Sequence, residues 1–316
     1  MECPVCEYPR SRVRYELKDR FFRTVEESFP LFECGSCGLL FQDPEVIAGR
    51  LAEFYPEGYW WNESGPLATI EARYREFVLK RDQVSFVSSL FAEPMKHRLL
   101  DIGCGSGGFV KLAGEAGFDA FGMDSSKGAV DTGMEAGVEQ LVCATEQDLR
   151  AAGEQYDILT LFHTLEHVLE PFQYLKRIRD LLKKPGSLIV QVPNRESYQA
   201  RIYGTRWYGL DCPRHVCNYT RHSLLYLLGR CGFRIQKIRH FSLRDNAAAI
   251  VSSAFPNLDP MSGRVRALRD GRKDGTLCSI AKEASYFGLV LSAQPLALLE
   301  AALQRGGTVT VHATWE

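Results

Sequence analysis

The sequence lacks a dominant charge of either sign. Its 316 residues contain 38 Lys and Arg and 39 Asp and Glu, which gives a formal net charge of −1. A chain without excess positive charge has little to attract a phosphate backbone, so we expect no nucleic-acid partner. The content of 45% hydrophobic residues also excludes a disordered chain, which combines low hydrophobicity with high net charge.

Long apolar runs are also missing. No stretch approaches the roughly 20 apolar residues that a membrane-spanning helix needs. Residues 1–6 lack the basic and then apolar pattern of a secretory signal. We therefore expect a cytoplasmic protein with one large domain or two smaller ones.

The sequence does have ten cysteines, and four of them form two CxxC pairs separated by 27 residues. Each CxxC turn presents two thiolates, and two such turns complete a tetrahedral four-sulfur shell around zinc. A redox pair is the alternative, but that motif accompanies a βαβ pattern, and none precedes residue 95. The spacing therefore predicts a structural Zn²⁺ ribbon over residues 1–45, held by Cys3, Cys6, Cys34 and Cys37.

Residues 46–95 have a helical pattern, which predicts a linker or lid after the ribbon. They include an aromatic cluster over residues 54–61. Such a cluster beside a glycine serves either as a packing hub between domains or as part of a substrate wall, and the packing interpretation is favoured.

From residue 98 onward, short apolar runs alternate with helical patterns. Strands are predicted near 98–102, 118–124, 140–143, 156–162 and 187–192, and a helix over 172–184. Alternation of this kind indicates βαβ units, a parallel sheet and an α/β domain over residues 96–316. Ligands of such sheets bind at the carboxyl ends of the strands.

A glycine loop follows the first predicted strand. Gly103, Gly105 and Gly108 also satisfy the GxGxxG pattern of dinucleotide sites. Asp101, two residues before the first glycine, disfavours a pyrophosphate but suits a ligand that carries an ammonium group, as S-adenosylmethionine does. Asp124 ends the next strand, where a carboxylate can bind a ribose diol. Nicotinamide-dependent oxidoreduction remains the alternative.

Several motifs of the chain are similar to those of a known family. LLDIGCGSGGF, FGMDSS, YDILTLFHTLEHVLEP and LLKKPGSLIVQVPN resemble motifs of class I S-adenosylmethionine-dependent methyltransferases. The finer resemblance is to ubiquinone-pathway O-methyltransferases. CGLLFQDP, YPEGYW and DCPRHVCNYT resemble a branch with an N-terminal zinc ribbon that is associated with sugar and glycan biosynthesis.

This resemblance implies a Rossmann-like sheet, mostly parallel with its last strand antiparallel. It also implies roles for individual residues. Those expected at the cofactor are Asp101, Gly103, Cys104, Gly105, Asp124, Ser125, Thr145 and Phe162.

Methyl transfer can require removal of a proton from the acceptor, and histidine is suited to that work near neutral pH. His167 and His215 are the candidate catalytic bases, and each could instead brace a loop. His163 and His167 also fit the HxxEH pattern of zinc proteases. We reject that interpretation because the motif directly follows a strand and is stopped by Pro171.

A polar loop at residues 211–215 is expected near the same cleft. His163, Asp211 and Arg214 are therefore candidate substrate-binding residues. Residues 201–240 contain eight basic side chains and one acidic one. This cluster favours an anionic acceptor such as a nucleotide sugar or phosphorylated glycan, although basic clusters often only solvate a helix face.

Residues 233–238 and 307–315 have strand patterns, and residues 242–306 form an insertion between them. Its basic and then apolar stretch, residues 261–303, could contact a membrane surface. The favoured alternative is a helical hairpin that packs on the core or forms a dimer contact.

The sequence therefore predicts an enzyme, an S-adenosylmethionine-dependent methyltransferase of small molecules, acting on a sugar or glycan hydroxyl. The alternatives are C- or N-methylation, a zinc-ribbon rRNA methyltransferase, and a non-catalytic ligand-binding module. The ribbon has six basic and nine acidic side chains, which opposes the rRNA alternative.

Overall fold

The centre of the molecule is a seven-stranded sheet with the order β10-β11-β8-β7-β4-β5-β6. It is seen in a computed structural model that describes residues 1–55, 81–270 and 276–316. The strands are β4 (Arg98–Ile102), β5 (Asp119–Asp124), β6 (Leu141–Cys143), β7 (Tyr156–Phe162), β8 (Leu182–Pro193), β10 (Arg234–Arg239) and β11 (Thr308–Trp315). Strands β4 to β8 pair in parallel, and β11 runs antiparallel to both of its neighbours.

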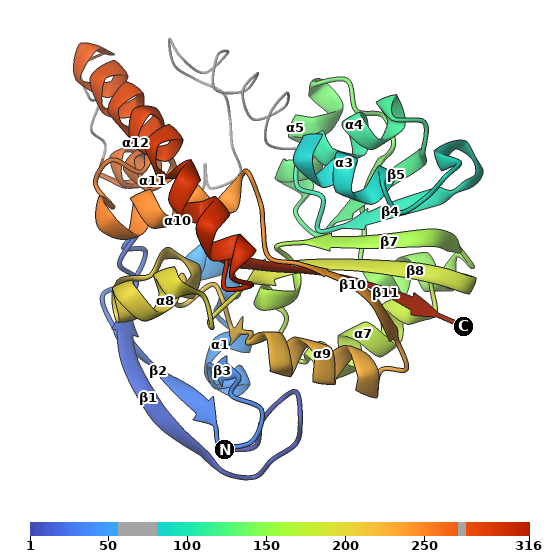
Figure 1. The fold of residues 1–316 in the computed structure, drawn as a ribbon, viewed down its shortest axis with the longest axis horizontal. Coiled ribbons are helices and arrows are strands. Elements are labelled where there is room, and N and C mark those ends of the chain that lie inside the picture. The colour runs from blue at the N-terminus through green and yellow to red at the C-terminus, as the bar shows by residue number, and fades with distance from the viewer. Residues whose placement is uncertain (56–80, 271–275) are drawn as a thin grey trace.

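Helices cover both faces of this sheet (Figure 1). One face holds α3 (Arg81–Ser88), α4 (Gly108–Glu115) and α5 (Lys127–Glu135), and the other holds α7 (Pro171–Arg179) and α9 (Arg221–Arg230). Side chains alternate between these faces, because Leu99 belongs to the core under α4 and Leu100 to the core under α7. The predicted α/β class, with its last strand inserted antiparallel, is confirmed.

The predicted helix over 172–184 is too long. Helix α7 ends at Arg179, and β8 already begins at Leu182, which pairs with Tyr156. Leu181 and Leu182 are buried beside the sheet, so tertiary packing overrides the helical spacing of this stretch.

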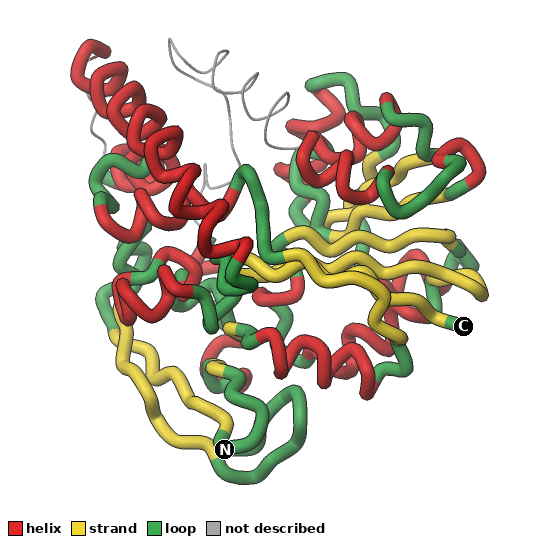
Figure 2. Tube along the Cα trace, viewed as in Figure 1, coloured by secondary structure: helices red, strands yellow, loops and turns green. Residues whose placement is uncertain are grey.

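A second, four-stranded sheet contains the predicted ribbon, which Figure 2 shows at the lower left in yellow. Its strands are β1 (Ser11–Lys18), β2 (Ser28–Cys34), β3 (Leu40–Phe41) and β9 (Cys217–Asn218). Strand β9 comes from the α/β domain and pairs with β3. The ribbon is therefore joined to the main domain through backbone hydrogen bonds.

The described part of the predicted linker contains α1 (Pro44–Ala48), α3 and two 3₁₀ turns (Leu51–Phe54 and Pro94–Lys96). The aromatic cluster from residue 56 onward lies outside the described residues. After β8 the chain forms α8 (Tyr198–Tyr203), and α6 (Glu146–Ala151) lies between β6 and β7.

The predicted insertion consists of α10 (Asp245–Ala254), α11 (Pro260–Arg269) and α12 (Thr276–Ala302). Helix α12 packs on α10 through a cluster that includes Val251, Tyr286 and Val290. Among the described residues, no helix has the length and apolar character needed to cross a bilayer. Membrane contact through residues 261–303 stays a prediction.

A buried arginine links the ribbon to the main domain. Arg214 is 0% exposed, and its guanidinium donates to Asp19 at 2.8 Å, to Asp211 at 2.7 Å and to the Phe54 carbonyl at 3.2 Å. The same group lies 4.2 Å from the ring centroid of Phe22. Burial opposes charge on Asp19, but the hydrogen bonds and charge of Arg214 hold the pKa of that carboxyl below its usual value.

Removing the ribbon's half of this pair is expected to destabilise the fold. Asp19→Asn keeps the shape of the side chain but leaves Arg214 less compensated, and breaking a buried pair in this way costs about 3 kcal/mol or more. Denaturant unfolding measures the change. Lys127→Ala, which removes an exposed pair with Asp131, is the control and should change stability little. If Asp19→Asn and Lys127→Ala lowered the free energy of unfolding equally, the pair of Arg214 and Asp19 would not stabilise the fold as described.

Candidate active site

The loop after β4 has the backbone shape that a closely bound ligand requires. Gly103 and Gly105 have φ values of +75° and +55°, in the left-handed region that favours glycine. A Cβ atom at Gly103 would lie 2.4 Å from Oγ1 of Thr164, so this position has no room for a side chain. A Cβ at Gly105 would meet nothing within 4 Å, so the loop borders open space there.

Asp124 connects this loop to the end of β5. Its Oδ2 accepts from the Gly105 amide at 2.9 Å, and its Oδ1 accepts from the Ser126 amide at 2.8 Å. Each carboxylate oxygen keeps further acceptor capacity, which suits a ribose diol. Ser125 is exposed beside it. Open space at Gly105 next to a buried carboxylate therefore fits the predicted S-adenosylmethionine site.

The other predicted cofactor residues lie around the same strand ends. Asp101 is buried and accepts a hydrogen bond from Thr160 at 2.7 Å, which ties β4 to β7. Phe162 packs against Phe109 with ring centroids 4.8 Å apart. Thr145 caps α6 in a reciprocal pair with Asp148. The cofactor roles of these residues, and of Cys104 in the loop, stay predictions.

His163 is held between two carboxylates. Its Nδ1 lies 3.0 Å from Glu166 Oε1, and its Nε2 lies 3.0 Å from Asp245 Oδ2. Burial opposes protonation of this ring, but Asp245 and Glu166 outweigh it and raise the pKa of His163 to about 10. Both ring nitrogens are thus occupied. The structure places His163 as a charged brace of the loop rather than as a free substrate ligand.

His167 is oriented by groups from two other parts of the chain. Its Nδ1 lies 2.8 Å from the Tyr55 hydroxyl and 3.0 Å from the Arg214 carbonyl oxygen. A carbonyl only accepts, so Nδ1 carries the proton and Nε2 keeps the lone pair. Burial and the neighbouring His215 lower the pKa of His167 to about 4, which keeps the ring neutral near pH 7.

His215 lies beside His167, with ring centroids 4.8 Å apart. Its Nδ1 lies 2.8 Å from the Gly209 carbonyl oxygen, which can only accept, so this nitrogen carries a proton. The structure therefore brings the two predicted catalytic histidines together, each with its Nδ1 directed at a backbone carbonyl.

The structure corrects the expectation that Arg214 and Asp211 lie over the cleft to bind substrate. Arg214 has no exposed surface, and Asp211 is engaged with it through both carboxylate oxygens. A buried cation with two carboxylate partners is not available to an anionic ligand. The sequence could not show this, because the second carboxylate partner of Arg214, Asp19, is 195 positions away.

The site also contains two residues, Tyr55 and Glu166, for which the sequence predicted no role. Glu166 is 1% exposed, and its Oε2 has no hydrogen-bond partner among the described residues. One ligand atom each from Glu166, His167 and His215 lie within 4.8 Å of one another, an arrangement able to share a proton or to hold a divalent cation. Only the aromatic cluster signalled Tyr55, and Glu166 was visible only as part of the HTLEHV motif.

The four ribbon cysteines converge as the spacing predicts. Sγ of Cys3 lies 3.6 Å from that of Cys37, and Sγ of Cys6 lies 3.5 Å from that of Cys34. A zinc ion with four sulfurs at about 2.3 Å has sulfur–sulfur edges of about 3.8 Å, so the donor set fits structural Zn²⁺.

The sheet order, the antiparallel last strand and the glycine loop beside an acid define a class I methyltransferase fold. A family model described as "Methyltransferase domain" matches residues 72–238. The chain belongs to this family, which confirms the resemblance found in the motifs and supports S-adenosylmethionine as the cofactor.

Curated relatives and solved structures are also similar to the chain. The ubiquinone biosynthesis O-methyltransferase of Cereibacter sphaeroides (strain ATCC 17025 / ATH 2.4.3) is 31% identical over 160 residues, which cover 47% of this chain and 65% of the relative. The ubiquinone biosynthesis O-methyltransferase of Ruegeria pomeroyi is 31% identical over 167 residues, which cover 47% of this chain and 66% of that relative. The matches thus span about 65% of the relatives' length. A methyltransferase from Thermotoga maritima, a possible histamine N-methyltransferase, has a TM-score of 0.47 at 16% identity and covers 79% of this chain and 97% of its own.

The cysteine cluster makes a direct prediction about metal content. The purified protein should contain about one zinc per chain by elemental analysis, and Cys37→Ser should lose most of it because a tetrahedral site needs all four ligands. Cys278→Ser, at an exposed position outside the cluster, is the matched control and should keep its zinc. Zinc-free wild-type protein that is fully folded would refute the site.

The ion-paired His163 predicts a particular pH dependence of stability. Its folded-state pKa of about 10 lies above the unfolded value of 6.5, so its contribution is complete below pH 6.5 and disappears as the pH rises toward 10. The gap in unfolding free energy between wild type and His163→Gln should therefore shrink from pH 6 to pH 10. His222→Gln, at an exposed position, should show no such trend. If the difference in unfolding free energy between wild type and His163→Gln did not change with pH, the His163 ring would be neutral in the folded protein.

Proposed function

We propose that this protein transfers the methyl group of S-adenosylmethionine to an oxygen of a small-molecule acceptor. The observation that carries the proposal is the juxtaposition of the open glycine loop and Asp124 on neighbouring strands, in a chain of the methyltransferase family. The bound cofactor would supply an activated methyl group. The residues of the chain would hold its ribose and direct its reactive end toward the acceptor.

His167 is the proposed general base. Its Nδ1–H is fixed by the Arg214 carbonyl and Tyr55, so Nε2 can accept the hydroxyl proton of an acceptor as that oxygen attacks the methyl carbon. Glu166 stays ionised, since His163 holds its pKa below the usual range against the effect of burial. A negative charge beside His167 would stabilise the imidazolium that forms when the ring accepts the proton.

The acceptor that we propose is a hydroxyl of a sugar or glycan. The curated relatives are named O-methyltransferases, which supports oxygen as the methylated atom. The sugar or glycan class rests on the motif resemblance, and C- or N-methylation of a metabolite is the runner-up. The buried state of Arg214 removes one of the residues that favoured an anionic acceptor.

Two measurements test the proposal together. Calorimetry should detect binding of S-adenosylmethionine but not of NAD, and transfer from radiolabelled cofactor to a panel of sugars, glycans and quinols should identify the acceptor. His167→Ala should then lower kcat by about 10²- to 10⁴-fold while cofactor affinity stays unchanged, because general-base catalysis contributes that much.

His222→Ala is the matched control, because it removes an exposed histidine on α9. Binding of NAD in place of S-adenosylmethionine would overturn the proposed reaction. Full activity of His167→Ala would remove His167 as the base but would leave the reaction in place.

A further inference from the structure

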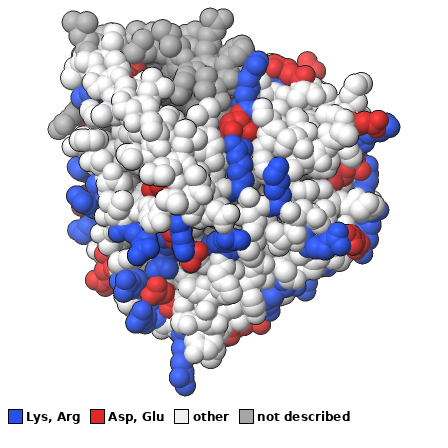
Figure 3. Space-filling model, viewed as in Figure 1, with Lys and Arg blue, Asp and Glu red and all other residues white. Residues whose placement is uncertain are grey.

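A cavity lined by arginines lies between the ribbon and α8. Its volume is about 390 Å³, within the range of small-molecule sites. In Figure 3 lysine and arginine side chains gather on the lower left of the face shown, over α8 and the ribbon. Its walls include Arg14, Tyr15, Arg195, Glu196, Arg201 and Arg305.

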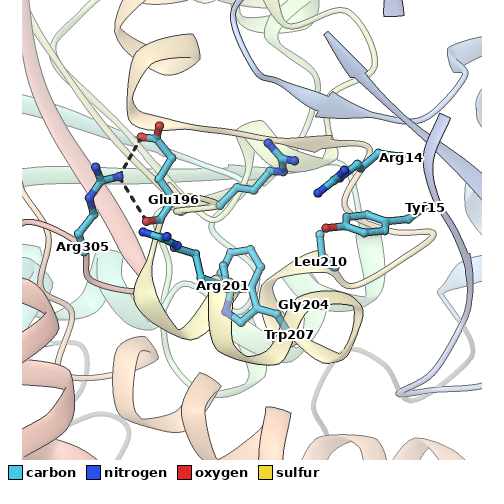
Figure 4. Close-up of a pocket in the computed structure, with 10 residues that line it drawn as sticks. Arg14, Tyr15, Glu196, Arg201, Gly204, Trp207, Leu210 and Arg305 are labelled. Carbon is cyan, nitrogen blue, oxygen red and sulfur yellow. Dashed lines mark hydrogen bonds and ion pairs between the residues drawn. The ribbon is translucent and has the colours of Figure 1, made fainter. Parts of the chain in front are cut away.

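The arginines approach this cavity from two sides. Figure 4 shows Arg14 and Tyr15 of β1 on one side and Arg201 of α8 with Arg305 on the other. Four guanidinium groups face a single lining carboxylate, that of Glu196. The cavity therefore has a strong excess of positive charge, which attracts anions.

Two of the four arginines are already used by the fold. Arg195 pairs with Glu33 and donates to the Gly38 carbonyl, and Arg305 lies 3.9 Å from a Glu196 oxygen. Arg14 and Arg201 form no ion pair with a described residue. Guanidinium groups on facing walls that are not held in an ion pair can bind phosphate oxygens in the bidentate manner that their geometry favours.

Another basic hollow in the described part of the chain has fewer cations without a carboxylate or backbone carbonyl partner. It contains Arg179, Lys183 and Lys184 beside Trp315. Lys183 pairs with Asp157 at 3.0 Å, and Arg179 donates to the Cys231 carbonyl at 2.8 Å. Lys184 lies over the Trp315 ring and forms no ion pair with a described residue. This hollow thus offers one cation held neither by a carboxylate nor by a backbone carbonyl of a described residue, whereas the cavity beside α8 offers two on facing walls.

We infer that the cavity between β1 and α8 binds a phosphate- or diphosphate-bearing ligand. Arg14 and Arg201 contact its oxygens, and the Tyr15 hydroxyl adds a hydrogen-bond donor. Trp207 and Leu210 supply an apolar wall for the rest of the ligand. This inference does not depend on the proposed methyl transfer, because none of the lining residues belongs to the cofactor loop or the histidine pair.

Inorganic pyrophosphate is the probe for the test, added to the full zinc-loaded chain at constant ionic strength. Calorimetry should show saturable binding, and Arg201→Gln should weaken it by at least about tenfold because one bidentate partner is lost. Arg234→Gln, at an exposed arginine on β10, is the control and should bind as wild type does. Zinc content and S-adenosylmethionine affinity show that both variants are folded.

Three outcomes would overturn the inference. The first is no saturable binding of pyrophosphate, and the second is an equal loss of affinity in Arg201→Gln and Arg234→Gln. The third is displacement of pyrophosphate by saturating S-adenosylmethionine, which would place the probe in the cofactor loop. Binding that persists with the cofactor bound supports a separate anion site, whether or not the protein transfers methyl groups.

Discussion

The buried ion pair between Arg214 and Asp19 is the constraint on which the candidate active site depends. Burial of a cation is tolerated only when carboxylates and hydrogen-bond acceptors surround it, and here Asp19 of the ribbon and Asp211 of the loop both do so. The same residue presents its backbone carbonyl to Nδ1 of His167. Gln42 of the ribbon strengthens this link, since its side chain donates to the carbonyls of Pro213 and His215. The ribbon thus holds in place the loop that carries Arg214 and His215 in the candidate site.

The sequence predicted the central fold well because its signals are local. Apolar runs of strand length, glycines at turns and the alternation of strand and helix patterns were sufficient to place five strands. The antiparallel direction of the last strand followed from the resemblance to the methyltransferase family. The length of α7 was wrong because Leu181 and Leu182 satisfy helical spacing but are buried beside the sheet instead. Strand β9 had no signal, since two residues, Cys217 and Asn218, form it only by pairing with the ribbon.

The residues of the candidate site also fall into two groups: those with a local signal in the sequence and those whose role depends on a distant partner. The glycine loop, Asp124 and the two histidines could be found because each follows a strand or lies in a recognisable motif. The roles of Arg214 and His163 could not, because each is decided by a distant carboxylate: Asp19 for the first and Asp245 for the second. A sequence shows which side chains can be charged, but burial and partners decide whether that charge faces a ligand or the interior.

General-base catalysis by His167 requires a neutral ring with its proton on Nδ1, so that Nε2 can accept the proton of the acceptor. Nitrogen NMR of histidine-labelled protein, titrated from pH 3 to pH 8, reports both properties. The account predicts a protonated Nδ1 and a pKa of about 4, with both altered in Asp19→Asn because the Arg214 carbonyl would shift. A proton on Nε2, or a pKa near the ordinary value of 6.5 in the wild-type protein, would contradict it.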